Sequence, residues 1–370
     1  MKEKEHKKFS KYAKLIIILI SMVLVLNILA RFRVICDFYV DNIFRIWVNT
    51  YGRITGIFPF SVGGVMVILA VVIILVALVL SVLLIFLRKK QRFKRFVLTY
   101  LKTVSVIVLI TGMIMTLNCS ALYRCSKINT DSRQYTEEEL KKVYCHVVEK
   151  CNELSVKVNR NELGEAEYNG DLMEAVRTAV RKMGTENKRF RGYTPKVKPF
   201  INNYLYYQAG IIGEYYPFSM EANCSKYLND ITAASTMAHE LSHLKGYIYE
   251  DEANYMGFLI CIKSDDEFLQ YAGYLSVLWY LTEDIYWADN WEELLRDAPV
   301  PNDYVNINDY ETYKITSKQV IEEIKPVIPT EIVENVSDTI TDAYLDYYKS
   351  EANYNEVTKL VLWYYDGILF

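Results

Sequence analysis

The chain has 370 residues, of which 52% are hydrophobic and 24% charged, and its formal net charge is −3. Residues 1–118 carry 17 Lys and Arg against 4 Asp and Glu, whereas the rest of the chain carries 25 against 41. Nucleic-acid binding needs clustered basic residues that replace phosphate counterions. The acidic balance after residue 118 therefore argues against nucleic acid as a partner, and we expect none. We expect a membrane domain over residues 1–118 and a globular domain over residues 119–370.

Three apolar segments lie within the first 118 residues. A helix needs about 20 residues to cross the hydrocarbon core of a bilayer. We predict transmembrane helices at about residues 12–30, 61–87 and 98–118, the last of which includes a snorkelling Lys102. The first segment also fits a cleaved signal peptide. Its end, from Asn27 to Phe32, lacks the small-x-small pattern of a cleavage site, and we favour a retained anchor.

Positive residues near the ends of transmembrane helices predict their orientation. Six lysines precede or open the first apolar segment, and residues 88–95 contain six more basic residues. The residues before the first apolar segment and residues 88–95 are therefore expected to lie in the cytoplasm. Three crossings then put residues 119–370 outside the cytoplasm, in a multi-pass protein of the cell membrane with the lipid bilayer as a partner. The loop over residues 31–60 faces the same side despite Arg31, Arg33, Arg45 and Arg53.

Six of the seven cysteines follow residue 118, and none forms a C-x-x-C pair. A zinc site made of thiolates is therefore not expected. Small buried thiols are favoured over disulfides, which would need an oxidising compartment.

The globular part predicts a mostly helical α+β domain. Helical spacing of apolar residues indicates helices at about residues 136–152, 170–183 and 268–281, and Thr136 suits a helix cap. Residues 192–199 form a turn-rich connector. Residues 204–218 favour a strand, with a bend at Gly210 and Gly213. Two helices that carry the sharpest motif of the chain follow this strand.

That motif is the HELSH segment at residues 239–243. At about 100° per residue, His239, Glu240 and His243 fall at roughly 0°, 100° and 40° around a helix, opposite an apolar face. Two imidazoles one turn apart can hold one zinc ion, and the glutamate between them reaches a water at the metal without being a ligand. With four histidines in the chain, this spacing is improbable by chance. We predict His239 and His243 as metal ligands and Glu240 as the catalytic residue.

A catalytic zinc needs a third protein ligand and one open position. Gly246 suits a helix end, and a second helix is expected to start near Tyr249. Glu250 shares a stripe of small or short residues with Asn254, so the two helices can approach closely and Asn254 can reach a ligating histidine. Glu252 points about 160° away from this stripe. We favour Glu250 as the third ligand, and Glu252 stays the alternative.

The HELSH segment followed by EDEAN resembles the gluzincin metallopeptidases, zincins whose third zinc ligand is a glutamate. In those families an Asp or Asn follows that glutamate by four residues, which matches Glu250 and Asn254. The metzincin pattern would place a histidine at Tyr249. The stretch from Pro217 to Asn254, after three apolar segments, also resembles an uncharacterised family of bacterial multi-pass membrane proteins of unknown function. The resemblance implies a zincin-like domain and a bacterial membrane setting.

The function expected from these residues is hydrolysis of peptide bonds in a peptide or protein substrate, with Zn²⁺ as cofactor and Glu240 as general base. Two alternatives compete with this function. A membrane sensor or binding module could keep a zincin fold without turnover, although Glu240 would then have no function. An intramembrane protease would need the motif inside a spanning helix, and no run after residue 118 reaches about 18 apolar residues.

Overall fold

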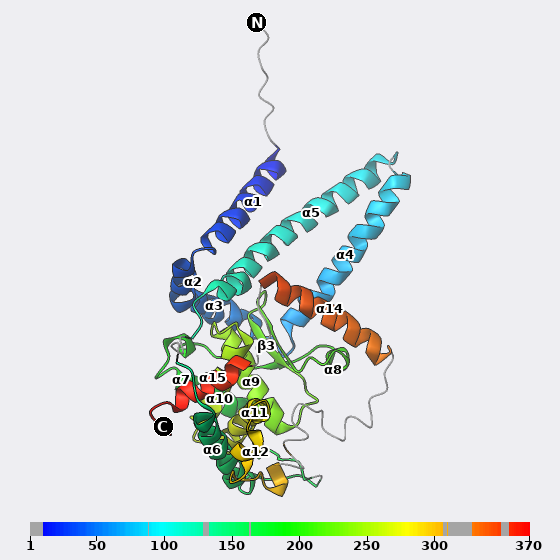
Figure 1. Cartoon of the computed structure of the whole chain (residues 1–370). Helices are drawn as coiled ribbons and strands as arrows, with labels where there is room; N and C mark the ends of the chain where they lie inside the picture. The colour runs from blue at the N-terminus through cyan, green and yellow to red at the C-terminus, as the bar shows by residue number, and fades with distance from the viewer. Residues whose placement is uncertain are drawn as a thin grey trace.

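The structure is a computed structural model that describes residues 10–87, 89–128, 133–162, 164–305, 309, 328–348 and 355–370. It is mostly helical, with one three-stranded sheet. Figure 1 shows three long helices that project from one side of a helical domain. These are α1 (Lys11–Leu29), α4 (Val62–Leu87) and α5 (Gln91–Met115).

The three projecting helices are long and apolar enough to cross a membrane. The bounds of α1 and α4 agree with the first two predicted transmembrane helices. The third helix begins earlier than predicted, at Gln91, and continues through a π-helical turn, η2 (Thr116–Ser120). Its first turns contain Arg92, Lys94 and Arg95. The prediction omitted these residues because they are charged, but basic residues commonly lie at the ends of transmembrane helices, outside the hydrocarbon core. The lysines before residue 10 and Arg88, on which the predicted orientation depends, lie outside the described residues.

The loop between the first two long helices is itself helical and packs on the domain. It contains α2 (Arg33–Tyr39), the π-helical η1 (Val40–Phe44) and α3 (Arg45–Thr55). Val40, Phe44 and Val48 are buried in the same core as residues beyond 118. The domain boundary at residue 118 stays a prediction, and the packing of the two parts crosses it.

The predicted helices of the globular part are confirmed. They correspond to α6 (Glu137–Ser155), α7 (Leu172–Met183) and α11 (Glu267–Tyr286). Thr136 caps α6 in a reciprocal capping box with Glu139, which satisfies two backbone N–H groups at the helix start. The remaining helices of the described residues are η3 (Leu122–Arg124), η4 (Lys188–Phe190), α8 (Asn203–Gln208), α9 (Asp230–Leu244), α10 (Glu250–Ile262), α12 (Trp291–Leu295), α14 (Thr330–Tyr348) and α15 (Asn355–Tyr365).

The strand predicted over residues 204–218 is wrong in its first half. Residues 203–208 form α8, because the Asn202 side chain accepts a hydrogen bond from the Leu205 N–H and caps a helix there. Gly210, at a φ of +68°, ends this turn, and only β2 (Gly213–Tyr216) is extended. Aromatic residues favour strands on average, but this local cap overrides the preference.

The sheet has the order β1-β3-β2. β3 (Glu221–Cys224) pairs antiparallel with β2 and parallel with β1 (Lys198–Pro199). β1 consists of the last two residues of the connector predicted over residues 192–199. Buried Glu221 accepts a hydrogen bond from the Gly63 N–H at 2.6 Å and pairs with the Lys198 ammonium. The start of α4 is therefore joined directly to the sheet, on which α9 packs.

The core lies among α6, α9, α10 and α11. The last three pack against one another, α6 packs on α11, and α9 also lies on β3. Six of the seven cysteines are buried, Cys145 is half-buried, and none forms a disulfide. These thiols therefore serve as small apolar core residues, as favoured from the sequence.

Candidate metal centre

Helix α9 carries the HELSH segment, and local signals fix both of its ends. The Asn229 side chain accepts a hydrogen bond from the Thr232 N–H at the start. Gly246 has a φ of +93° just after the last turn, a conformation that favours glycine. This turn brings the chain back as α10, which packs along α9.

Gly257 allows the two helices to approach closely. A Cβ atom there would lie 3.3 Å from the His239 backbone nitrogen and 3.5 Å from its Cα. The stripe of small residues predicted on α10 therefore faces α9, as expected from the sequence.

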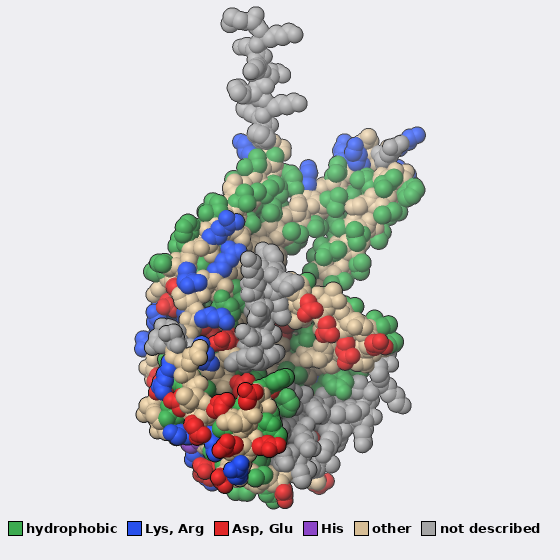
Figure 2. All heavy atoms as spheres, in the orientation of Figure 1, with side chains coloured by type: hydrophobic (Ala, Val, Ile, Leu, Met, Phe, Trp, Pro, Cys, Tyr) green, Lys and Arg blue, Asp and Glu red, His purple; other side chains and the backbone are tan. Residues whose placement is uncertain are grey.

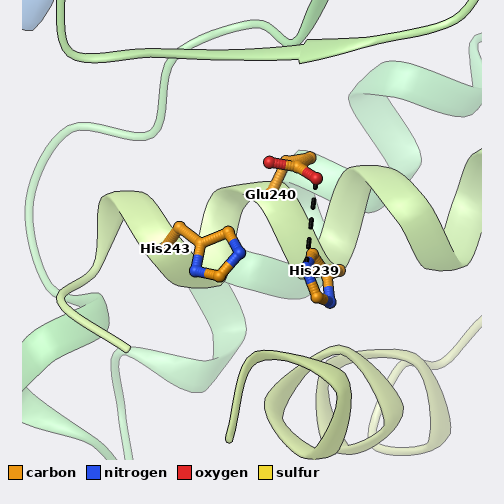
Figure 3. Close-up of side chains that lie close together, drawn as sticks. All are labelled: His239, Glu240 and His243. Atoms are coloured by element: carbon orange, nitrogen blue, oxygen red, sulfur yellow. Dashed lines mark ion pairs between the residues drawn. The ribbon is translucent and has the colours of Figure 1, made fainter. Parts of the chain in front are cut away.

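His239, Glu240 and His243 lie together on α9 (Figure 3), with one nitrogen or oxygen atom of each within 4.8 Å of the others. The Nε2 of His239 lies 4.0 Å from the Glu240 Oε1. Glu240 and His243 are buried, and His239 is half-buried. This cluster could hold a metal ion.

Hydrogen bonds orient both imidazoles. The Nδ1 of His239 donates to the Asn254 Oδ1 at 2.9 Å, and the Nδ1 of His243 donates to the Tyr247 carbonyl oxygen at 2.7 Å. Each bond places the proton on Nδ1, so that the lone pair of each Nε2 is available as a metal ligand. Asn254 thus lies where the sequence predicts a partner for a ligating histidine.

The structure separates the two candidates for the third ligand. Glu250 places its Oε2 3.2 Å from the His239 Nε2 and its Oε1 3.7 Å from the His243 Nε2. Glu252 points elsewhere, because its Oε1 accepts a hydrogen bond from the Ile128 N–H at 2.5 Å. The Glu250 side chain, 38% exposed, is therefore the carboxylate that faces both imidazoles. Its role as a ligand stays a prediction.

Glu240 lies against β2 at Gly213, where the lack of a side chain lets the strand come close. A Cβ atom at Gly213 would overlap the Glu240 carboxylate and come within 2.8 Å of the Thr236 Cγ2. The Oε2 of Glu240 is buried and has no hydrogen-bond partner among the described residues. An unpaired buried carboxylate oxygen is unfavourable unless a proton, water or cation compensates it.

The titration of the cluster reflects its crowding. Burial raises the pKa of Glu240 well above its ordinary value, and the nearby Glu250 and Glu214 carboxylates raise it further. Burial also lowers the pKa of His243 to about 4, so its imidazole is neutral at pH 7. For Glu250, partial loss of hydration raises the pKa, but His243 and His239 outweigh it and lower the pKa to about 2. A neutral His243 imidazole beside an ionised Glu250 carboxylate is the combination of protonation states that metal binding requires.

A cleft of about 250 Å³ opens beside the cluster. Residues 210–213 form one wall, α9 and α10 contribute His239, Glu240 and Glu250, and α11 contributes Ser276 and Tyr280. The sequence did not single out Tyr280, one of 31 tyrosines, because nothing local marks it.

Glu214 was also missed by sequence reasoning. It follows Gly213 on β2 and lies close enough to Glu250 to interact with its charge. Burial, with a further contribution from Glu250, raises the pKa of Glu214 to about 7. To predict that Glu214 lies near the cluster, one would have to know that β2 packs on the HELSH helix.

The fold and the cluster define a class of protein with three membrane-length apolar helices and a helical domain that has a possible His-Glu-His metal site. The chain belongs to the family described as "Protein of unknown function (DUF3810)", whose model matches residues 39–362. No curated protein and no solved structure matches the chain. The resemblance to an uncharacterised family is thus confirmed, whereas no peptidase family is matched.

Proposed function

We propose that this protein is a membrane-anchored zinc-dependent peptidase with a gluzincin-like site. The observation that carries the proposal is the position of Glu250, whose two oxygens face the Nε2 atoms of His239 and His243. Two imidazoles and one carboxylate are the donor set of a catalytic zinc that keeps one open position. The cleft beside these atoms gives a substrate access to that position.

The residues present fit a divalent cation. Both Nε2 atoms carry free lone pairs, and the buried Glu240 Oε2 has no hydrogen-bond partner among the described residues. When bound, zinc would supply a Lewis acid that activates a water molecule and polarises a carbonyl group. A positive charge here would also oppose the repulsion between Glu240, Glu250 and Glu214, and return the pKa of Glu240 toward its ordinary range.

Glu240 is the proposed general base. In its ionised form, a carboxylate oxygen accepts a proton from the attacking water and later delivers it to the amine that leaves the peptide. Gly213 lets the β2 backbone approach this side chain closely, because a Cβ atom there would meet the Glu240 carboxylate.

The cleft wall provides the proposed substrate position. β2 is an edge strand of the three-stranded sheet, and it continues from the residues that line the cleft. An extended peptide can pair with such an edge through backbone hydrogen bonds. Tyr280 lines the opposite side of the cleft and is the proposed hydrogen-bond donor to the oxyanion.

The proposed setting is the cell membrane, with the N-terminus in the cytoplasm and the site outside it. Three helices of crossing length and the basic residues at their ends support this orientation. The alternative is a sensor or binding module without turnover, for which Glu240 would be dispensable.

A cleavage assay tests the proposal. The full chain in detergent, loaded with zinc, is incubated with a peptide library, and new termini are identified by mass spectrometry. Glu240→Gln is the control, because it keeps the size of the side chain and removes the base. Cleavage that falls by about 100-fold or more in this variant is expected. Equal peptide turnover by both proteins would contradict the role of Glu240, and no turnover by the zinc-loaded wild type would favour the binding module.

A further inference from the structure

The segment over residues 31–60 has two apolar faces. On one face, Cys36, Tyr39 and Val40 of the α2–η1 region and Val48 of α3 are buried against the domain. On the opposite face, exposed apolar side chains recur through both helices, namely Val34, Ile35, Phe38, Ile46, Trp47 and Ile54. At about 100° per residue, the exposed residues of each helix fall within an arc of roughly 100°. Since one apolar face of each helix is already buried against the domain, the exposed apolar face is available to contact a second apolar partner.

Charge in this segment is sorted between the two sides. Both of its acidic residues bond to the domain: Asp37 accepts from the Ser126 N–H at 2.7 Å, and Asp41 pairs with Arg189 at 2.8 Å. The four arginines, by contrast, are exposed and form no ion pair with a described residue. They are Arg31, Arg33, Arg45 and Arg53, the last of which stacks on the Tyr193 ring.

One of the arginines also borders the exposed apolar face. With Arg45 at 0° around α3, Arg53 lies at roughly 80°, next to Ile46 at about 100°, whereas Arg45 lies between the apolar face and the buried Gly52 at about 340°. Apolar side chains flanked by cationic ones are the pattern of a helix that lies in the interface of an anionic membrane. The tryptophan on this face suits the same depth.

The place of the segment in the fold identifies its partner. It joins the end of α1 to the start of α4, so it lies where two membrane-length helices meet the domain. Figure 2 shows Lys and Arg side chains gathered where α1 meets the domain, next to the apolar surface of that helix. We propose that α2 and α3 lie on the bilayer surface, with their exposed apolar face among the acyl chains and Arg31, Arg33, Arg45 and Arg53 against the phosphates of anionic phospholipids.

Such a surface would also fix the height of the metal centre above the membrane. Val40 packs against Gly246, the residue that ends the HELSH helix, so closely that a Cβ there would lie 2.7 Å from the Val40 Cγ1. Gly52 of α3 also contacts Met220, in the turn before β3, where a Cβ would lie 3.5 Å from the Met220 carbonyl oxygen. Contact with anionic phospholipids would explain why four arginines lie on the same side of the membrane as the domain, although Lys and Arg usually concentrate on the cytoplasmic side.

A matched pair of probes tests the apolar face. Ile54→Cys on α3 and Tyr286→Cys at the end of α11 replace side chains that are 57% and 55% exposed. Tyr286 precedes α12, which lies in Figure 1 at the end of the domain opposite to the long helices. The full chain, with half-buried Cys145 changed to Ser, is labelled with an environment-sensitive dye in phospholipid vesicles. We expect a blue-shifted emission that doxyl lipids quench at residue 54 only.

A second pair of variants tests the charges. Arg33→Gln with Arg45→Gln removes two arginines of the segment, and Lys142→Gln with Arg296→Gln removes the same charge elsewhere on the domain. Enrichment of a spin-labelled anionic lipid over a zwitterionic one around the chain is expected to fall about two-fold or more in the first pair only. Water-like emission at residue 54, or equal lipid enrichment in both pairs, would overturn the proposal. Self-quenching that rises with protein density would instead assign the face to a second copy of the chain.

Discussion

The Asn254 Oδ1 lies 2.9 Å from the His239 Nδ1 and joins the two helices of the candidate metal centre. This bond sets the tautomer of His239 and directs its Nε2 toward Glu250. Because α9 and α10 are joined at this point, the geometry of the site depends on a residue that touches no metal.

Removing this hydrogen bond should therefore weaken metal binding. Asn254→Ala is expected to lower the affinity for zinc by about 10- to 100-fold, as found when partners of ligating histidines are lost. Asn254→Asp is the matched control, because a carboxylate oxygen can accept the same bond and should keep the affinity within a few-fold. Competition with a zinc chelator measures both. Equal affinities for wild type and Asn254→Ala would show that the bond does not position His239.

A methyl group at Gly213 should disable the site without removing its ligands. It would overlap the Glu240 carboxylate, so either β2 or Glu240 must move, at a cost of about 1–3 kcal/mol. Gly213→Ala is therefore expected to lose peptide cleavage while still binding zinc. The control is Gly210→Asn in the same cleft wall, where a Cβ meets nothing within 4 Å and Asn tolerates the positive φ. Full activity of Gly213→Ala would contradict the close approach of β2 and Glu240.

Glu252 should make the stability of the domain depend on pH. Burial, the largest effect, raises the pKa of Glu252 from 4.5 to about 7, although the bond from Ile128 opposes this. The folded state therefore holds a proton that the unfolded state releases above pH 4.5. The stabilisation is complete below that pH and is lost as pH rises to about 7, to an extent of the order of 3 kcal/mol.

Glu252→Gln keeps a hydrogen-bond acceptor for Ile128 and removes the titration. Its melting temperature in detergent should exceed that of the wild type by more at pH 8 than at pH 5. The difference between the two proteins isolates Glu252 from the other titrating groups. A difference that does not change with pH would contradict a raised pKa for this carboxylate.

Local patterns in the sequence predicted the parts of the fold that depend on neighbouring residues. The spacing of His239, Glu240 and His243 placed them on one helix, and Thr136 marked the start of α6. The segment over residues 203–208 was mistaken for a strand, because the cap at Asn202 is a single hydrogen bond that composition does not reveal. Pattern reasoning weighs many residues, whereas one cap can decide a short helix.

Residues that reach the site from distant parts of the chain were beyond such patterns. Glu214 and Tyr280 come to the cluster on β2 and α11, and only the packing of these elements on α9 brings them there. The choice between Glu250 and Glu252 needed the same information, since both lie in the first turn of α10. Helical spacing favoured Glu250, and the structure shows that its carboxylate faces the histidines.

The central claim is that His239, His243 and Glu250 hold one zinc ion. Metal content by mass spectrometry tests it most directly, on the full chain in detergent as wild type, His239→Ala, Glu250→Gln and Glu252→Gln. The account predicts about one zinc per chain in the wild type and in Glu252→Gln, and a loss of zinc in the other two. A folded wild type without bound metal, or an unchanged zinc content in His239→Ala and Glu250→Gln, would contradict it.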